Sequence, residues 1–383
     1  MTKPVILTGL RANNDLTLGN YFGGILPMID MAKTRSNEFQ INMFIPDLHS
    51  FTTPIEHSGL YEQILHNARL FTAAGLPLDN PDIHLYRQSY VPAHSELTWI
   101  LNCFTDIGEM NRMTQFKDKT GRLSATGIAF KAMEELRIEN PAAYWEGDPT
   151  DLINSKIQEI NERAKETASL GLFSYPVLMA SDILLYGAKY VPVGDDQTQH
   201  LEFTRDIAER MNMRFGELFV VPEPVKKQHE FFGKDQGLRI MDLQNPMKKM
   251  SKSDESGKGV IFLSDSPEAA AKKIMSAATD SVGIVHYDKE NQPGISNLLE
   301  IHALLSGETV QAVAEHHDGQ ESYGELKKEI AQQVKEFLTD FQAKLKKVDD
   351  AAILAKLEVS EKAMNEQANA TLFKVQQAVG LRK

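Results

Sequence analysis

Cysteine is almost absent from this chain, and long apolar runs are missing. The single cysteine, Cys103, excludes an internal disulfide and any zinc site built from several cysteines. No apolar run reaches the roughly 18 residues that a membrane-spanning helix needs, and the first residues lack the profile of a secretory signal. With 25% charged and 42% hydrophobic residues, the composition predicts a soluble globular protein of the cytoplasm with no membrane partner.

An excess of basic residues is also lacking, because the net charge is −12 over 383 residues. This balance excludes indiscriminate binding to nucleic acid, although a local basic face can coexist with an acidic total. The length allows one large domain and a smaller one.

Short apolar runs alternate with helical patterns up to about residue 222. Strands are predicted at Val5–Thr8, Ile41–Ile45, Ile83–Tyr86, Tyr190–Val193 and Leu218–Val221. One helix between them is predicted to start at Pro92. The alternation predicts an α/β fold with a doubly wound parallel (Rossmann-like) sheet, which binds ligands at the carboxyl ends of its strands. The loops after Thr8, Ile45 and Val193 are therefore expected to share one site.

The last part of the chain has a helical pattern only. Apolar residues from Leu326 to Leu345 recur every three or four positions, and a further pattern runs to Val375 before Gly380. We predict a Rossmann-like catalytic domain over 1–255 and a helical domain over 256–383, whose last helix can pack back on the first domain. The polar segment of about 119–168, with helical stretches at Phe130–Leu136 and Leu152–Ala164, is interpreted as a helical insertion.

A cationic loop is predicted at Lys249-Met250-Ser251-Lys252-Ser253, between Pro246 and two glycines. Two lysines three positions apart can close over a triphosphate and neutralise the charge of a departing pyrophosphate. A solvated basic turn is the alternative interpretation.

A second motif, Thr17-Leu18-Gly19-Asn20, follows the first predicted strand. Gly19 lets a nucleotide approach the backbone, while Thr17 and Asn20 offer neutral hydrogen bonds to phosphate or ribose. An ordinary helix cap and turn would use the same residue types.

A third pattern places Tyr175, Met179 and Asp182 on one face of an apolar helix. A buried carboxylate needs a partner, and the indole N–H of tryptophan is a donor only, so Asp182 suits that ligand. A local hydrogen bond of Asp182 is the alternative. The segment from Val191 to Gln197 then places a glycine and two acids after a strand, where they could accept bonds from ribose hydroxyls or simply cap a helix.

Together these motifs resemble the two signatures of class I aminoacyl-tRNA synthetases, and most of the chain is similar to their bacterial-type tryptophanyl family. Thr17 and Asn20 stand where the wider class has histidines, as in tryptophan-specific members. Met179 stands where the tyrosine-specific family has glutamine. The segments Ser89–His94 and Glu109–Lys119 also match the tryptophanyl family, although the second by itself indicates a charged helical face.

Three features depart from that family. Leu7 stands where an aromatic residue is usual, Arg11-Ala12-Asn13-Asn14 replaces the usual loop, and the insertion is longer than the usual connection. Arg11 could add a phosphate contact in that altered loop.

The resemblance implies a tryptophan–tRNA ligase that acts as a homodimer. It implies activation of L-tryptophan with ATP to tryptophanyl-adenylate and pyrophosphate, then transfer to the 3′ end of tRNA(Trp), with the helical domain meeting the anticodon. Mg²⁺ would come with ATP, on phosphates and waters, without a metal site built by the protein.

The implied site residues fall into three groups. The catalytic candidates are Thr17, Asn20, Lys117, Lys249 and Lys252. The ATP site shares four of these and adds Arg11, Gly19, Val193, Gly194, Asp195, Asp196, Gln197, Met250 and Ser251. The tryptophan site comprises Leu7, His49, Gln115, Tyr175, Met179, Asp182, Val191, Val193 and Gln197.

Two alternative functions remain open from the sequence, a tyrosine enzyme and a binding protein. A tyrosine enzyme of similar architecture is disfavoured by Met179. A synthetase-derived binding protein would be expected to have lost one of the loop lysines, and both are present. A nucleotidyltransferase of the same superfamily would lack the helical domain and the pocket around Asp182.

Overall fold

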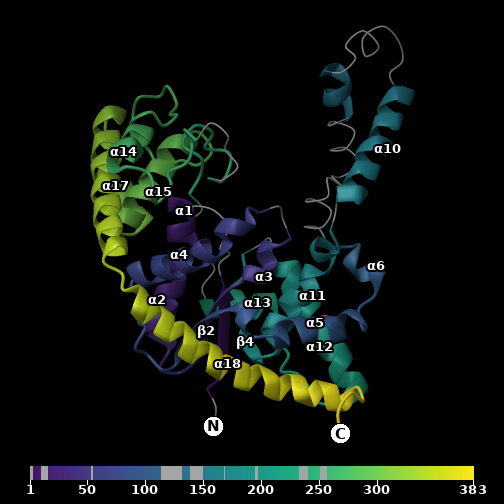
Figure 1. Cartoon of the computed structure of the whole chain (residues 1–383). Coiled ribbons are helices and arrows are strands. Elements are labelled where there is room, and N and C mark those ends of the chain that lie inside the picture. The colour runs from purple at the N-terminus through teal and green to yellow at the C-terminus, as the bar shows by residue number, and fades with distance from the viewer. Residues whose placement is uncertain are drawn as a thin grey trace.

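A four-stranded parallel sheet lies at the centre of the protein, in the order β3-β2-β1-β4 (Figure 1). The computed structural model describes residues 3–9, 16–52, 55–113, 132–138, 150–167, 169–194, 197–232, 240–250 and 257–383. The strands are β1 (Val5–Gly9), β2 (Gln40–Ile45), β3 (Ile83–Arg87) and β4 (Ala188–Tyr190). The predicted α/β fold with a doubly wound parallel sheet is confirmed.

The fourth strand begins earlier than predicted. β4 covers Ala188–Tyr190, so most of the predicted strand Tyr190–Val193 lies beyond the sheet. There the Val191 amide donates to the side-chain oxygen of Gln228, at 3.0 Å, and not to a neighbouring strand. The chain thus leaves the sheet soon after β4 and continues as a loop along its carboxyl edge.

The strand predicted at Leu218–Val221 is wrong. The amides of Leu218 and Phe219 donate to Oδ1 of Asn212, at 3.0 and 2.8 Å, and the Phe219 carbonyl accepts from Nδ2 of the same side chain. One asparagine therefore takes the backbone groups that a sheet would use, and the apolar run covers the end of a helix.

Helices connect the strands and form the C-terminal part. Before β4 they are α1 (Leu18–Asn20), the π-helical turn η1 (Tyr21–Ile25), α2 (Leu26–Arg35), α3 (Asp47–Ser50), the 3-10 turn η2 (His57–Gly59), α4 (Leu60–Ala73), the 3-10 turn η3 (Gln88–Tyr90), α5 (Ala93–Asn102), α6 (Ile107–Met110), α10 (Thr150–Thr167) and α11 (Leu170–Leu184). After β4 they are α12 (Thr198–Phe215), α13 (Val225–Phe232), α14 (Pro267–Met275), α15 (Pro293–Ser306), α16 (Val310–His317), α17 (Tyr323–Lys346) and α18 (Asp350–Ala378). The helix predicted from Pro92 is confirmed as α5, with Pro92 as its N-cap. Among the described residues, no helix has the length and apolar character needed to span a membrane.

Side chains of the sheet alternate between two apolar cores. Ile6, Ile41 and Ile83 belong to a core shared with α2, α4 and the helices α14 to α17. Phe44 and Tyr86 belong to the other core, with α5, α11, α12 and α18. Burial on both faces explains why these strands read as nearly continuous apolar runs.

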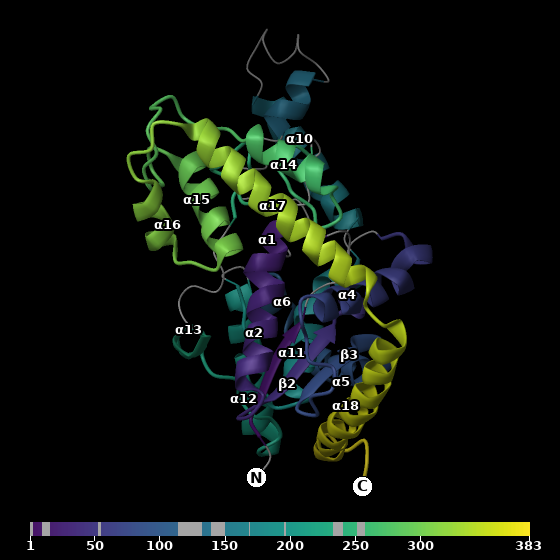
Figure 2. The ribbon, with the colours of Figure 1, turned by 90° about the vertical axis from the view of Figure 1, so that its left-hand side faces the viewer.

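The predicted long C-terminal helices are confirmed as α17 and α18. On α17, Leu326, Ile330 and Val334 are fully buried, as the spacing requires. Figure 2 shows α17 crossing α14 and α15, while α18 turns back along the sheet. Gly380, with φ of 85°, lies just beyond the end of α18, where a left-handed residue stops a helix.

The last helix is attached to the edge strand β3 by buried polar contacts. Ser360 Oγ of α18 accepts from the Leu85 amide at 3.2 Å. Arg87 forms a two-point ion pair with Glu361, at 2.6 and 2.8 Å, and its guanidinium lies 3.3 Å from the centre of the Tyr90 ring. Both charged side chains are less than a tenth exposed, so each depends on the other for solvation.

We expect Glu361→Ala to lower the free energy of unfolding by about 3 kcal/mol, because it leaves the Arg87 charge buried without its partner. Denaturant unfolding of the full chain measures the effect. Glu358→Ala, at an exposed position of the same helix, is the matched control and should change stability by less than about 0.5 kcal/mol. Equal losses in both variants would contradict a structural role for this ion pair.

The helical stretches predicted in the segment of about 119–168 are confirmed in its described part. Residues 132–138 are helical, and α10 covers Thr150–Thr167. Ala132 and Ile160 form a small apolar cluster, and the Lys156 ammonium lies 3.6 Å from the Glu135 carboxylate. These helices project away from the sheet in Figure 1 and have a small core of their own.

Candidate active site

Thr17 and Asn20 form a closed capping box at the start of α1. Thr17 Oγ1 accepts from the Asn20 amide, and Asn20 Oδ1 accepts from the Thr17 amide, each at 3.1 Å. The turn is also held from outside, since the Leu18 amide donates to the Ile261 carbonyl at 2.8 Å. The Thr17 side chain is buried, whereas Gly19 and Asn20 are partly exposed. A ligand would therefore meet Gly19 and Asn20 first, on a turn that is already fixed.

The two predicted signature motifs meet at Gly19. A Cβ atom added there would lie 3.8 Å from Met250 Cβ and 3.7 Å from Ile240 Cβ, which are ordinary van der Waals distances, so Gly19 lies next to both segments. The Met250 amide donates to the Ile240 carbonyl at 3.0 Å, and Lys249 pairs with Met241 in an antiparallel bridge. Lys249 is exposed. The fold thus places the first residues of the lysine loop, Lys249 and Met250, beside the Thr17–Asn20 turn.

Asp182 lies at the centre of a buried hydrogen-bonded network. His49 Nε2 contacts its Oδ2 at 2.8 Å, while Gln88 Nε2 and His94 Nδ1 contact its Oδ1 at 2.7 and 2.6 Å. These three partners come from α3, η3 and α5, whereas Asp182 belongs to α11. A carboxylate only accepts, so each partner donates a hydrogen to it.

Burial would favour the neutral form of Asp182, but the hydrogen bonds from His49 and His94 outweigh it and hold the pKa of the carboxyl below its usual value. Asp182 is therefore an ionised group in an apolar surrounding. Of the contacts among described residues, Oδ1 takes two and Oδ2 takes one. Since a carboxylate oxygen has about two acceptor sites, Oδ2 keeps one acceptor position beyond its contact with His49 among the described residues.

A second layer of side chains fixes this network. His94 Nε2 contacts the Tyr186 hydroxyl at 2.8 Å, and the Leu48 amide donates to Gln88 Oε1 at 3.2 Å. Burial raises the pKa of the Tyr186 hydroxyl, so this group stays protonated and donates to the imidazole. Of these, His94 and Gln88 bond Asp182 directly, yet neither is among the site residues predicted from the sequence. The signal for His94 was the segment Ser89–His94, whereas Gln88 has no sequence pattern that distinguishes it.

Tyr175 is connected to the same region. Its hydroxyl contacts His200 Nε2 at 2.7 Å, and its ring lies edge-on to His49, with centroids 6.2 Å apart. Met179 is partly exposed one turn further along α11 and packs against the same core. Two residues of the predicted face, Tyr175 and Asp182, therefore both contact His49, which lies on α3 directly after β2.

The remaining predicted residues lie as follows. Leu7, Val191 and Val193 are buried in the core shared with Tyr175. Gly194 is exposed, and its carbonyl accepts from the Gln197 amide at 2.8 Å, directly before α12. The residues Arg11, Gln115, Lys117, Asp195, Asp196, Ser251 and Lys252 lie outside the described part of the chain.

Comparison with known proteins identifies the family. The model of a family described as tRNA synthetases class I (W and Y) matches residues 2–134 and 153–339. The tryptophan–tRNA ligase of Leifsonia xyli subsp. xyli is 39% identical over 382 residues, covering 99% of this chain and 97% of that protein.

Solved structures agree. The tryptophanyl-tRNA synthetase of Mycoplasma pneumoniae matches with a TM-score of 0.75 and 31% identity, over 100% of this chain and 98% of that one. The Campylobacter jejuni enzyme, complexed with ADP and tryptophan, matches with a TM-score of 0.70 and 28% identity, over 98% of this chain and 100% of that one. From the match to the family model and the full-length relative, the chain belongs to the class I tRNA synthetases of the tryptophan and tyrosine group.

Proposed function

We propose that this chain is a tryptophan–tRNA ligase: it activates L-tryptophan with ATP and transfers the amino acid to tRNA(Trp). The observation that supports it most directly is the packing of Gly19 against Met250, which brings the two motifs needed for nucleotide activation to one place. The full-length similarity to tryptophan–tRNA ligases, and to a structure that holds ADP and tryptophan, supports the choice of substrates.

In the first step the tryptophan carboxylate attacks the α-phosphate of ATP, forming tryptophanyl-adenylate and releasing pyrophosphate. The carboxylate is already a nucleophile, so the protein must supply positioning and charge stabilisation. We assign charge stabilisation to Lys249, Lys252 and Lys117, and nucleotide placement to Thr17, Gly19 and Asn20. ATP would arrive with Mg²⁺ on its phosphates.

Tryptophan would lie against Tyr175 and Met179, with its indole N–H donating to the remaining acceptor position of Asp182. His49 and His94 act as positioning residues, because their bonds keep the carboxylate ionised and oriented. In the second step the acyl group passes to a ribose hydroxyl at the 3′ end of tRNA(Trp), and adenosine monophosphate leaves. The helices α14 to α17 would meet the anticodon in a cytoplasmic homodimer.

Amino-acid-dependent exchange of labelled pyrophosphate into ATP tests this function. Tryptophan, tyrosine and phenylalanine are compared at equal concentration, and we expect exchange with tryptophan alone. Exchange with tyrosine would instead identify a tyrosine enzyme and overturn the argument from Met179. Exchange with none of the three would identify a binding protein that has lost catalysis.

A further inference from the structure

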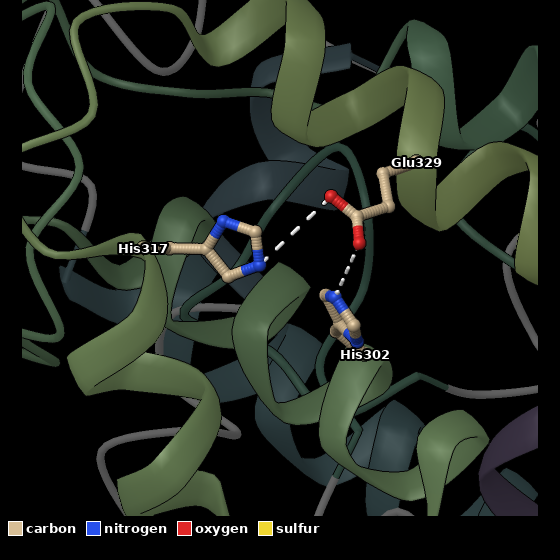
Figure 3. Close-up of side chains that lie close together, drawn as sticks. All are labelled: His302, His317 and Glu329. Atoms are coloured by element: carbon tan, nitrogen blue, oxygen red, sulfur yellow. Dashed lines mark hydrogen bonds and ion pairs between the residues drawn. The ribbon is translucent and has the colours of Figure 1, made fainter.

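A cluster of two histidines and a glutamate joins three helices of the C-terminal part. His302 belongs to α15, His317 is the last residue of α16, and Glu329 belongs to α17 (Figure 3). Both imidazoles are buried, each only 5% exposed, whereas the Glu329 side chain is about half exposed, at 48%. None of the three belongs to the proposed active site, so their arrangement needs a separate explanation.

The potential ligand atoms of this cluster converge. One atom from each residue lies within 4.8 Å of the others. His302 Nε2 donates to Glu329 Oε1 at 3.2 Å, a hydrogen that a bound ion would replace, and His317 Nε2 is 4.0 Å from Glu329 Oε2. Figure 3 shows the three side chains at the corners of a triangle, with one ring nitrogen of each imidazole turned toward the carboxylate.

The hydrogen bonds of His317 identify which nitrogen faces the carboxylate with a lone pair. Its Nδ1 contacts the amide oxygen of Gln320 at 2.8 Å. An amide oxygen only accepts, so Nδ1 carries the hydrogen and, in the neutral ring, Nε2 is an acceptor. That Nε2 is buried and has no hydrogen-bond partner among the described residues. Two acceptors, Nε2 and the carboxylate, therefore face each other, and a cation between them would satisfy both.

We propose that His302, His317 and Glu329 form a binding site for one divalent transition-metal ion, of which Zn²⁺ fits best. Two imidazoles and one carboxylate are a common Zn²⁺ ligand set, and the Nδ1–H bond to Gln320 is the outer contact that orients a metal-binding histidine. Imidazole ligands disfavour Mg²⁺ and Ca²⁺, which prefer oxygen.

Ligand atoms of a tetrahedral zinc site lie roughly 3.3 Å apart, given metal–ligand bonds of about 2.0 to 2.1 Å. The ligand atoms of this cluster, which lie within 4.8 Å of one another, would have to move closer together around an ion. The two histidine side chains are buried, whereas the Glu329 side chain is half exposed. Its exposure also leaves the fourth position open to water. The bound ion would tie the end of α16 to α15 and α17.

Zinc binding to the full-length protein tests this site. A competition titration with a chromophoric chelator is expected to give one Zn²⁺ per chain, and His302→Asn, His317→Asn and Glu329→Gln should each weaken it by about 100-fold or more. The matched controls are His316→Asn, at the exposed neighbouring histidine, and Glu336→Gln, on α17; both should bind as the unmodified protein does. Because Glu329 is half exposed, its variant keeps the test valid if a buried histidine variant fails to fold.

Thermal unfolding of the protein with and without Zn²⁺ is the second measurement. A ligand that binds only the folded state raises its stability, so Zn²⁺ at about 100 times its dissociation constant should raise the melting temperature by about 3 °C. That rise should disappear in Glu329→Gln and remain in Glu336→Gln. No binding to the unmodified protein, or equal loss of binding in His316→Asn and His317→Asn, would overturn the proposal. So would tight binding that persists in all three cluster variants, which would place the ion elsewhere.

Discussion

Asp182→Asn is expected to lower kcat/KM for tryptophan in pyrophosphate exchange by roughly 10²- to 10³-fold, the effect of breaking a buried charged network. Asparagine has nearly the same shape, but one carboxylate oxygen becomes an NH₂ group. The NH₂ group would point at side chains that now donate to Asp182, because His49 contacts one oxygen while Gln88 and His94 contact the other. An amide NH₂ turned toward Gln88 and His94 would lose the bonds that these two side chains donate. Turned toward His49, it would keep a bond only if that imidazole changed its tautomer.

The ratio between two amino acids separates recognition from general damage. Phenylalanine lacks the indole N–H, so a site with a buried acceptor rejects it strongly. If Asp182 receives that N–H, the preference for tryptophan over phenylalanine should fall sharply in the variant. Equal losses for both amino acids would mean that Asp182 only supports the fold.

Asp47→Asn is the matched control, because Asp47 is a second buried carboxylate at the same edge of the sheet. Its Oδ1 accepts from the amides of Leu48 and Ser89, at 3.0 and 2.9 Å, and its Oδ2 accepts from Ser89 Oγ, at 2.5 Å. Asp47 thus fixes this part of the backbone and not the histidines. We expect Asp47→Asn to lower the stability while keeping the preference for tryptophan. A change of preference in both variants would remove the special role of Asp182.

Unfolding at low pH should also reveal the charge of the Asp182 carboxylate. The pKa of Asp182 is lower in the folded protein than its usual value of 3.8, so the stability that it contributes is complete above that value. It is lost as the pH falls through the lowered pKa. Asp182→Asn should therefore remove part of the acid sensitivity of unfolding below about pH 4.

The parts of the fold that the sequence predicted well are those decided by local patterns. β1, β2 and β3 are buried on both faces, so each is a continuous apolar run, and α17 has an apolar stripe over its whole length. The run Leu218–Val221 looks the same locally, but Asn212 binds its backbone across a turn. That competition depends on one side chain outside the run, which a pattern of hydrophobicity does not contain.

The candidate site likewise has features that local sequence patterns predict and features that depend on the fold. Asp182 stands out in the sequence because a carboxylate in an apolar helix needs a partner. Its partners could not be predicted, since His49, Gln88 and His94 come from elements that only the fold brings together. Similarly, the contact of Gly19 with Met250 joins residues more than half a chain apart. Resemblance predicted that the motifs share a site, and the packing brings Gly19 beside Met250.

Lys249→Ala is expected to lower kcat for pyrophosphate exchange by roughly 10²- to 10³-fold, with little change in KM for tryptophan. The negative charge on the phosphates grows and shifts as pyrophosphate departs, so a cation placed there stabilises the transition state more than the ground state. The geometry supports this placement. The backbone of Lys249 is paired with Met241 and that of Met250 with Ile240, which fixes the start of the loop against the turn at Gly19.

The neighbouring Lys248 provides the control, because it is an exposed lysine one position away that lies outside the predicted motif. A role that depends only on local positive charge would be shared by the two lysines. A role in the transition state requires the position of Lys249, so Lys248→Ala should keep kcat within about twofold, the scale of an exposed charge screened by salt. A rise in KM for ATP without a fall in kcat would mean that Lys249 binds the ground state only. Equal effects of the two substitutions would mean that the other lysines, Lys252 and Lys117, stabilise the charge of the transition state.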